Sequence, residues 1–327
     1  PIIKAANSLN SKNKIDHFTK NKQNTITLLK KIKDESIVIY KKDKRYFAPR
    51  YVQELKKILK KNINSHLLSG GTDLSLVVTK ERKDINSVIY MNSINELNYI
   101  KNNNQYIEVG ATTPLIDFES YIEKYYSDFT AILKRYGSVQ IRNVATVAGN
   151  IATASPIGDT LPLLLSLEAK VVLKSIKKTK IVPLNDFFIG YRKTKLKKGQ
   201  FIDSIRIPLF PKNIFKAYKI SKRFDDDISS VCASFNLEVI NKKIKNIRIA
   251  YGGMASIPKR AKYCEKILLN SSITEQIINK AKEALEKDFK PISDMRASRK
   301  YRMEVAKNLL HKCFLEITQN KLIRVNN

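Results

Sequence analysis

The sequence predicts an α+β protein of two domains, and three observations support this. The chain has 327 residues, a usual length for two domains, and 43% of them are hydrophobic, enough for a sizeable core. Up to Pro208 and Pro211, strand-like and helix-like segments alternate without a fixed order, and these prolines make the best domain boundary. Beyond them, three strand-like segments are followed only by helix-like ones, which predicts an antiparallel sheet with helices.

The first domain follows a polar, Lys-rich arm, which we interpret as residues 1–45 with a helix-like stretch at 25–32. The first clear helix follows Pro49, where apolar residues recur with a helical period on one face. They are Val52, Leu55, Ile58 and Leu59. Thr113 and Pro114 are the expected N-cap and first residue of a later helix.

The remaining elements are predicted from apolar periodicity and from the turn residues that bound each run. In the first domain we expect strands at 66–68, 87–91, 97–101, 106–109, 170–175, 180–183 and 201–207, and helices at 113–125, 129–136 and 160–167. The pair 97–101 and 106–109 is expected to form a hairpin around Asn102-Asn103-Asn104. In the second domain we expect strands at 215–221, 231–240 and 245–250, and helices at 259–269, 274–286 and 296–320.

The formal net charge of +31 favours anionic partners, nucleic acid among them. However, the basic residues are mostly Lys, they are spread along the whole chain, and Asn and Ile are abundant with them. Neither Arg-based base readout nor a set motif of exposed aromatic residues is found. We therefore interpret the charge as compositional background and nucleic-acid binding as the less favoured reading.

Several classes of site are not supported by the sequence. The longest apolar stretch, 161–173, is interrupted by polar and charged residues, whereas a membrane span needs roughly 20 near-continuous apolar residues. The cysteines, Cys232, Cys264 and Cys313, have no metal-ligand spacing and are expected to be reduced structural thiols in a cytoplasmic protein. The three histidines are scattered, so we predict neither a metal site nor a catalytic histidine.

Two segments carry small residues in a pattern suited to a phosphate. Ser69-Gly70-Gly71-Thr72-Asp73 follows a predicted strand, and its glycines let backbone N–H groups approach an anion while Thr72 adds a hydroxyl. The pattern is neither a P-loop nor a dinucleotide fingerprint, and taken alone it is better explained as a tight connecting turn. Ala148-Gly149-Asn150 is a second such turn, after the β-type run 144–147, inside the charge-poor segment 137–159.

Other candidate residues have two readings each. Thr146 and Asn150 offer side-chain hydrogen bonds, and Asp159 offers an acceptor for a ribose hydroxyl or, alternatively, an N-cap for the helix at 160–167. Tyr136 could stack on a planar ring or be a core aromatic residue. The charged run 222–227 after Lys219 is either a gated, salt-bridged element or a solvated hairpin turn.

Together these segments resemble the flavin-binding part of the molybdenum hydroxylases, most closely the small subunit of bacterial xanthine dehydrogenase. The resemblance runs from about residue 34 to residue 321. It rests on HLLSGGTDLSL, RYGSVQIRNVATVAGNIATASPIGDTLPLL, FFIGYRKTKLKKGQFIDSIRIP, AYKISKRFDDDISSVCASFNLEV and IRIAYGGMASIPKRA, which follow in family order. PIIKAANSL at the start also looks like the segment that follows the last cluster-ligating cysteines of that subunit.

The resemblance implies a fold and its boundaries. Residues 34–211 would form a vanillyl-alcohol-oxidase-type FAD-binding domain of two α+β subdomains. Residues 212–321 would form a C-terminal domain like that of the carbon monoxide dehydrogenase flavoprotein, with a three-stranded antiparallel sheet plus helices. Residues 1–33 would be a linker after absent iron–sulphur domains, and 322–327 a tail.

The resemblance also assigns roles by position. It implies a pyrophosphate-wrapping loop, formed by Leu67, Leu68, Ser69, Gly70, Gly71, Thr72, Asp73 and Leu74. It implies a second wrap, formed by Thr146, Val147, Ala148, Gly149 and Asn150, with Asp159 on the adenosine side. It places Tyr136 near the isoalloxazine, Lys219 in reach of the flavin, and a mobile charged loop at Lys222 to Ser229 beside the ring. Tyr191 and Arg192 would lie near the entrance for a nicotinamide.

The implied function is electron transfer from [2Fe–2S] clusters through FAD to NAD⁺, in an oxidoreductase that is xanthine dehydrogenase or a carbon monoxide dehydrogenase-like relative. A separate large subunit would carry the molybdenum cofactor, and no side chain of this chain would need to be a general acid or base. Two alternatives stay open, a basic nucleic-acid-binding protein and a flavoprotein scaffold that has lost its cofactor. The first leaves the charge-poor segment 137–159 unexplained.

Overall fold

The computed structural model describes residues 2–9, 16–32, 35–320 and 322–323, in two compact units, 1–36 and 37–327. The first unit contains helices α1 (Ile2–Leu9) and α2 (His17–Lys30). The Asp16 side chain caps α2 by accepting a hydrogen bond from the Thr19 amide at 2.8 Å. The helix-like stretch expected at 25–32 is therefore the end of a longer helix.

The second unit begins with a four-stranded sheet of order β1-β2-β4-β3. β1 (Ile37–Lys41) and β2 (Lys44–Ala48) form an antiparallel hairpin, and β2 and β3 (His66–Leu68) both run parallel to β4 (Ser87–Tyr90). Helix α3 (Val52–Lys61) joins β2 to β3. The Lys-rich arm therefore does not extend to residue 45. Its last part is the hairpin, which sequence periodicity missed because every residue of the edge strand β1 is exposed.

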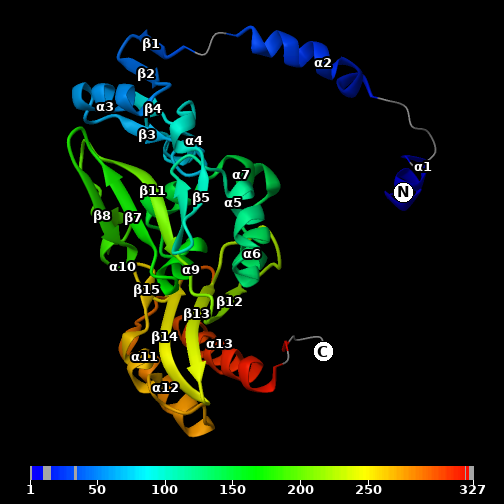
Figure 1. The fold of residues 1–327 in the computed structure, drawn as a ribbon, viewed down its shortest axis with the longest axis vertical. Helices are drawn as coiled ribbons and strands as arrows, with labels where there is room; N and C mark the ends of the chain where they lie inside the picture. Colours follow the sequence, from blue (N-terminus) through cyan, green and yellow to red (C-terminus); the bar gives the residue numbers. More distant parts are fainter. Residues whose placement is uncertain (1, 10–15, 33–34, 321, 324–327) are drawn as a thin grey trace. The chain divides into compact units, whose positions relative to one another are not determined.

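The second sheet is five-stranded and antiparallel, with the order β5-β6-β11-β7-β8. Its strands are β5 (Ile100–Asn102), β6 (Tyr106–Gly110), β7 (Lys170–Lys174), β8 (Thr179–Pro183) and β11 (Phe201–Pro208). The predicted hairpin is confirmed, with Ile100 opposite Val109. β11 pairs with both β6 and β7, so it joins two hairpins that are distant in sequence. Figure 1 shows this sheet between the two four-stranded sheets of the unit.

Helices connect and cover these strands. They are α4 (Ser75–Thr79), the 3-10 turn η1 (Asn95–Leu97), α5 (Leu115–Ile122), α6 (Ser127–Lys134), α7 (Val139–Val144), α8 (Val147–Thr153), α9 (Thr160–Ser166) and α10 (Leu184–Phe187), and a small ribbon of β9 (Phe188–Gly190) and β10 (Lys193–Thr194) follows. All residues of α9 are buried, because this helix packs against α6, α8 and α10 and against the sheet of the C-terminal domain. This helix therefore joins the two domains through one continuous core.

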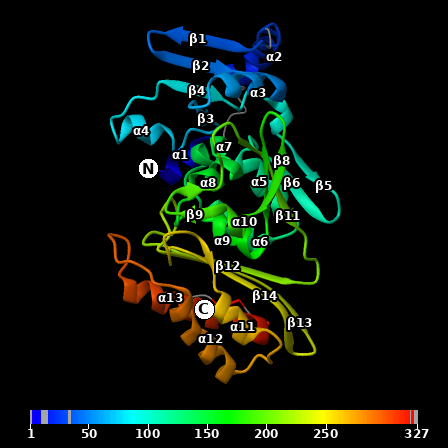
Figure 2. The same ribbon diagram turned by 90° about the vertical axis from the view of Figure 1, so that its left-hand side faces the viewer.

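The C-terminal domain has the predicted order of strands and then helices. Its sheet contains β12 (Ile214–Ile220), β13 (Val231–Ile240), β14 (Lys243–Gly252) and the short β15 (Lys259–Arg260), and its helices are α11 (Lys262–Leu268), α12 (Glu275–Asp288) and α13 (Arg299–Gln319). The sheet has a fourth strand because 259–260, expected to open a helix, pair with β14. Figure 2 shows the three helices gathered on one face of this sheet.

Two local expectations were wrong. The run 144–147 is not a strand: only Ala145 and Thr146 are extended, because Val144 ends α7 and the Thr146 hydroxyl starts α8 by accepting from the Gly149 amide at 2.9 Å. Thr113 does not cap α5, whose N-cap is Pro114. The Thr113 hydroxyl instead donates to the Tyr99 carbonyl at 3.0 Å, across to the start of β5.

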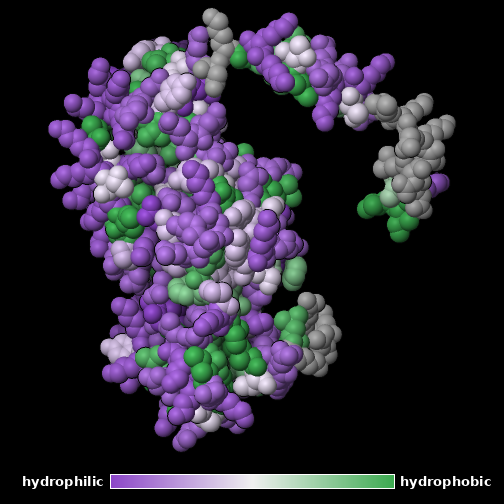
Figure 3. Space-filling model, viewed as in Figure 1, coloured by the Kyte–Doolittle hydropathy of each residue, from purple (hydrophilic) through white to green (hydrophobic). Residues whose placement is uncertain are grey.

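The surface follows from the composition. Figure 3 shows hydrophilic side chains over most of the face that it presents. Among the helices in the described ranges, none combines the length and the apolar character that crossing a membrane requires.

Candidate functional site

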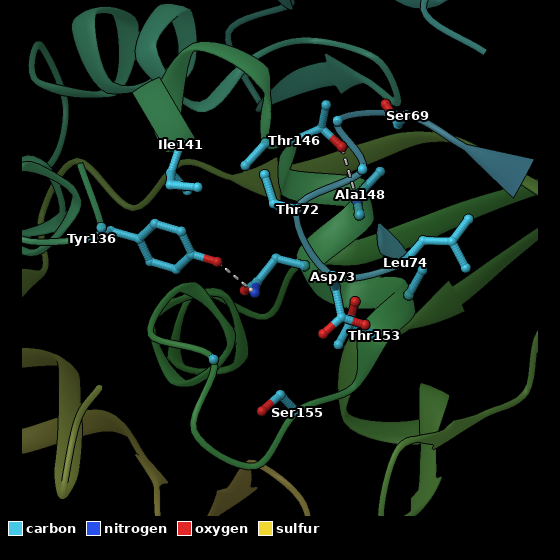
Figure 4. A pocket seen from close by; sticks show the side chains of 18 of the residues that line it. Ser69, Thr72, Asp73, Leu74, Tyr136, Ile141, Thr146, Ala148, Thr153 and Ser155 are labelled. Carbon is cyan, nitrogen blue, oxygen red and sulfur yellow. Dashed lines mark hydrogen bonds between the residues drawn. The ribbon is translucent and has the colours of Figure 1, made fainter. Parts of the chain in front are cut away.

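A cavity of about 820 Å³ opens in the second unit, within the size range of roughly 300–1,000 Å³ that ligand sites occupy. Four segments supply most of its lining: the loop after β3, the helices α7 and α8, the turn before α9, and the end of β12 with the loop after it. Figure 4 shows the first two facing each other, with Ser69 to Leu74 opposite Thr146 and Ala148. The cavity therefore brings together the two small-residue segments and residues of the C-terminal domain.

The loop after β3 offers a row of free backbone donors. Within the described part of the chain, the amides of residues 70–74 donate to no protein acceptor. Gly71 has a φ of +72°, which turns the loop around the cavity. Residues other than glycine rarely adopt this backbone conformation. Such a run of unpaired N–H groups is a typical binding site for an anion.

Gly70 is required by a contact that joins the two small-residue segments. A Cβ on Gly70 would lie 2.0 Å from the Val144 carbonyl oxygen, so only glycine lets the loop pack on the end of α7. The Ser69 hydroxyl donates to the Asn92 side chain at 2.6 Å and fixes the loop from its other side. The position of the free amides thus depends on both neighbours.

Asn150 organises the opposite wall. Its amide nitrogen donates to the Tyr136 hydroxyl at 3.1 Å, and its carbonyl oxygen accepts from the Thr160 hydroxyl at 2.6 Å. Figure 4 shows the Tyr136 ring directed into the cavity from the end of α6, beside Ile141. Burial, and then the nearby Asp159 and Asp73 carboxylates, raise the pKa of Tyr136, so its phenol stays protonated at neutral pH.

Asp159 and Lys219 form a buried ion pair at the base of the cavity. The Lys219 Nζ donates to Asp159 Oδ2 at 2.5 Å, and the Ser229 hydroxyl donates to Asp159 Oδ1, also at 2.5 Å. Both members of the pair are nearly inaccessible to solvent. Asp159 does not cap α9 with its side chain, contrary to the alternative reading. Its two carboxylate oxygens instead accept hydrogen bonds from residues of the C-terminal domain.

A second ion pair lies at the rim of the cavity. Arg192 donates to Asp73 Oδ2 at 2.5 Å, and both side chains are about half exposed. Arg192 has a φ of +51°, an uncommon conformation for a side-chain-bearing residue. Tyr191, which was expected beside it, is exposed and does not line the cavity.

The charged loop after β12 is held by Arg135. The Arg135 guanidinium donates to the carbonyls of Phe224 at 2.8 Å and Lys219 at 3.0 Å, and it lies 4.4 Å from the centre of the Phe224 ring. Within the loop, the Arg223 amide donates to Asp227 Oδ2 at 2.8 Å. Of this loop, residues 226–228 line the cavity.

The structure brings nearly all predicted site residues together. Leu67 to Leu74, Tyr136, Thr146, Ala148, Gly149, Asn150, Asp159 and Lys219 line the cavity, whereas the Val147 side chain is buried in the core. Val147 could therefore contribute only through its backbone.

Sequence reasoning missed several lining residues. They include Ile141, Gly158 and Ile202. Ile202 comes from β11, and its position between β6 and β7 depends on strand pairing that no local pattern reveals. For Gly158 the sequence offered only a weak indication, its position in the charge-poor segment. In the structure, a Cβ added at Gly158 would lie 3.0–3.2 Å from the side chains of Leu161 and Asn150.

Comparison with known proteins decides the family. Residues 40–210 match the family described as the FAD binding domain in molybdopterin dehydrogenase, and residues 216–317 match the carbon monoxide dehydrogenase flavoprotein C-terminal domain. The chain belongs to this flavoprotein family. The expected fold, an FAD-binding domain followed by a flavoprotein C-terminal domain, is confirmed.

Similar proteins include complete chains and parts of longer ones. Xanthine dehydrogenase of Emericella nidulans is 33% identical over 76% of this chain, which spans 19% of that protein. The glyceraldehyde dehydrogenase medium chain of Sulfolobus acidocaldarius is 29% identical over 85% of this chain, which spans 100% of that protein. The chain therefore spans about a fifth of one relative and the whole of the other.

Solved structures agree on the fold. A chain of carbon monoxide dehydrogenase from Hydrogenophaga pseudoflava superposes with a TM-score of 0.78 at 25% identity, covering 83% of this chain and 96% of that one. Quinoline 2-oxidoreductase from Pseudomonas putida 86 gives a TM-score of 0.77 at 22% identity, covering 85% and 98%. The second likeness concerns the fold alone.

The residues of the cavity fit FAD. The free amides of 70–74 suit a diphosphate, the packing of Gly70 on the end of α7 fixes their position, and the cavity is large enough for a dinucleotide-sized ligand. The described residues do not indicate a metal site, since no group of three or more His, Cys, Asp or Glu side chains suited to a metal occurs among them. The cysteines there are buried and unpaired with each other.

Proposed function

We propose that this chain is the FAD-carrying electron-transfer component of a molybdenum hydroxylase, and that the cavity is its FAD site. The observation that carries the proposal is the row of unpaired amides at 70–74, packed through Gly70 against the end of α7. Five consecutive donors at the rim of a large cavity lack a protein partner in the described part of the chain, and a bound diphosphate would satisfy them. Membership of an FAD-binding family supports the same assignment.

We propose the following roles for the lining residues. Residues 67–74 hold the diphosphate with their backbone, and residues 146–150 complete the cradle from the N-terminal turn of α8. Tyr136 packs against the ring system, positioned by the Asn150 side chain. Asp159 keeps its proposed place on the adenosine side, because each carboxylate oxygen accepts one hydrogen bond, from Lys219 or from Ser229, and can accept another from a ribose hydroxyl.

Bound FAD would supply one- and two-electron transfer, and the protein would supply binding, orientation and electrostatics. Lys219 places a buried positive charge at the cavity wall, and Asp159 keeps it there. The Tyr136 phenol stays protonated, so it can donate a hydrogen bond but does not act as a base at neutral pH. Apolar side chains such as Ile141 and Ile202 line the same space and would shield part of bound FAD from water.

We propose a partner-dependent reaction with NAD⁺ as the acceptor. The chain spans only 19% of a xanthine dehydrogenase but the whole of a glyceraldehyde dehydrogenase medium chain, so the rest of the reaction belongs to other domains or subunits. We propose that these carry the [2Fe–2S] clusters and the molybdenum cofactor, with residues 1–33 as the linker towards them. The rim at Arg192 and 226–228 is where the nicotinamide would enter.

Xanthine dehydrogenase is the favoured whole enzyme, and a carbon monoxide dehydrogenase-like hydroxylase is the alternative. Several relatives are named xanthine dehydrogenase, among them those of Emericella nidulans and Dictyostelium discoideum. The domain limits 34–211 and 212–321, with the tail 322–327, and the cytoplasmic location belong to this same proposal.

Anaerobic addition of NADH to the FAD-loaded chain tests the acceptor, because hydride transfer is reversible and needs no cluster or molybdenum. We expect NADH to bleach the visible flavin band, as dithionite does. Bleaching by dithionite but not by NADH would overturn the NAD⁺ assignment and leave the FAD site standing. For the substrate, the enzyme purified with its partners should reduce NAD⁺ with xanthine, and failure there with activity on another substrate would favour the alternative.

A further inference from the structure

Arg302 is a buried arginine in the C-terminal domain, outside every residue assigned to the cofactor cavity. It lies in the first turn of α13 and is 1% exposed, among the largest fully buried side chains of the described residues. Its guanidinium donates to the carbonyls of Ser230 and Gly253, the latter at 3.1 Å, and to Asp294 Oδ1 at 2.7 Å. One charged group thus joins three separate segments.

Packing alone does not account for this residue. Burying a charge is costly unless its hydrogen bonds are complete, and the Arg302 Nε has no acceptor in the described part of the chain. Asp294 is a partial compensation, since its side chain is still 27% exposed. Only the planar fork of an arginine can reach these three acceptors at once, which a lysine or an apolar residue cannot do.

The first segment leads directly to the buried ion pair. Ser230 is bonded to β12 through its amide, which donates to the Ile220 carbonyl at 2.8 Å. Its neighbour Ser229 donates to Asp159 Oδ1 at 2.5 Å. By holding the Ser230 carbonyl, Arg302 fixes the turn from which Ser229 reaches Asp159.

The second segment, at Gly253, leads to the part of the cavity wall that lies within residues 155–159. The Gly253 amide donates to the Pro156 carbonyl at 2.7 Å, and residues 155 and 157–159 line the cavity. Gly253 has a φ of +80°, and a Cβ there would lie 2.3 Å from the Ser230 carbonyl oxygen. Because Gly253 lies so close to Ser230, the single guanidinium of Arg302 can donate to both carbonyls.

The third segment reaches the charged loop after β12. Asp294 also accepts from the amides of Arg296 and Ala297, which orders the turn before α13. In the same turn, the Met295 carbonyl accepts from Lys222 Nζ at 2.8 Å. The turn that Arg302 holds thus anchors the start of the loop that lines the cavity rim at 226–228.

We propose that Arg302 is a positioning residue for the cofactor site. From the C-terminal domain it fixes the turn at Ser229, the 155–159 wall and the anchor of the charged loop, and so the placement of the Asp159–Lys219 pair. Arg302 is not among the residues that line the cavity. The inference rests on the proposed FAD site, whose properties Arg302 would tune from a distance.

The test compares Arg302→Lys with Arg260→Lys in the full chain. Arg260 lies in the same domain, is largely buried, and makes a two-pronged contact with Glu265 at 2.6 and 2.9 Å, away from the cavity. Each variant is titrated with FAD after removal of bound cofactor, and the flavin reduction potential is then measured. Thermal unfolding without FAD reports the loss of stability of each variant.

We expect Arg302→Lys to raise the FAD dissociation constant by about 10- to 100-fold, the range that removal of an outer-shell partner costs at metal sites. The reduction potential should shift as well, because Lys219 moves. Arg260→Lys should change neither quantity, although it also loses stability. Equal FAD affinity and potential in Arg302→Lys and wild type would overturn the inference, and so would equal losses in the two variants.

Asp294→Asn provides a second variant if Arg302→Lys does not fold. It removes the negative charge but keeps an oxygen for the Arg296 and Ala297 amides. Weakened FAD binding with a folded chain would support the inference, and unchanged binding would overturn it. Wild-type protein that fails to bind FAD would overturn the proposed function together with this inference, whereas wild-type binding with unaffected variants overturns the inference alone.

Discussion

At the scale of single residues, the site depends on contacts between positions that are far apart in the chain. The sequence indicated Gly70 through its neighbour Gly71, but the reason for Gly70 is the carbonyl of Val144. Asp159 was identified as a candidate, yet its partners, Lys219 and Ser229, come from the next domain. Residue type and local spacing predicted which positions matter, and only tertiary packing shows what each one contacts.

Gly70→Ala should weaken FAD binding by about tenfold or more, equivalent to about 1.4 kcal/mol. The added Cβ would collide with the Val144 carbonyl oxygen and displace the free amides of the loop. Gly71→Ala is the matched control, since its Cβ would meet only the end of the Leu68 side chain, at 3.3 Å. It should mainly cost stability, about 1 kcal/mol, because of its positive φ. FAD titration and thermal unfolding measure both, and equal affinities in the two variants would contradict the account.

Asp159→Asn should destabilise the protein by about 3–5 kcal/mol, because it leaves the Lys219 ammonium buried without its counter-charge. Asp73→Asn breaks the exposed pair with Arg192 and should cost at most about 1 kcal/mol. Urea unfolding of both variants without FAD makes the comparison. Similar losses at the two positions would show that the Asp159–Lys219 pair is not buried as described.

At the scale of elements, apolar periodicity predicted the interior strands and the helices with one buried face. β3 and β13 have the predicted limits, and α3 buries two of the four residues expected on its face, Leu55 and Leu59. Periodicity failed for β1, an exposed edge strand, and for β15, which is only two residues long. It also misread 144–147, where a side-chain cap starts a new helix and overrides the β-branched composition.

The junction of α6 with β12 should respond to pH through Asp128. The carboxylate accepts from the Ala217 amide at 3.2 Å. Burial is the main cause that raises the pKa of Asp128, Lys216 opposes it, and Glu316 adds to it. A carboxyl whose pKa is raised by folding stabilises the folded state below its unfolded pKa of 3.8, and that contribution is lost as the pH rises through the folded pKa.

Asp128→Asn removes this titration, so the variant should gain stability relative to wild type as the pH rises from below 3.8 to 7. The difference in urea midpoint between the two proteins, measured across that range, gives the result. A difference that stays constant, or one that shrinks towards pH 7, would contradict the assigned direction of the pKa shift.

At the scale of the whole molecule, the composition was less informative than the arrangement. The net charge of +31 favoured nucleic acid on its own, but it is spread over the chain, and the cavity lies where the sequence is poorest in charge, at 137–159. The two-domain α+β architecture was predictable from the order of elements. The joining of the domains through α9 and through the Asp159–Lys219 pair was not, because it depends on side chains that meet only in the folded chain.

The central claim is that FAD occupies the cavity, and the most direct measurement is the cofactor content of the purified full chain. The visible spectrum is recorded, and the cofactor released by acid is identified and counted. The account predicts the two-band spectrum of oxidised flavin and about one FAD per chain, retained by wild type and lost or weakened in Gly70→Ala. A colourless chain that cannot be loaded with FAD, yet binds DNA with a log–log salt slope of about −0.9 per neutralised phosphate, would contradict it.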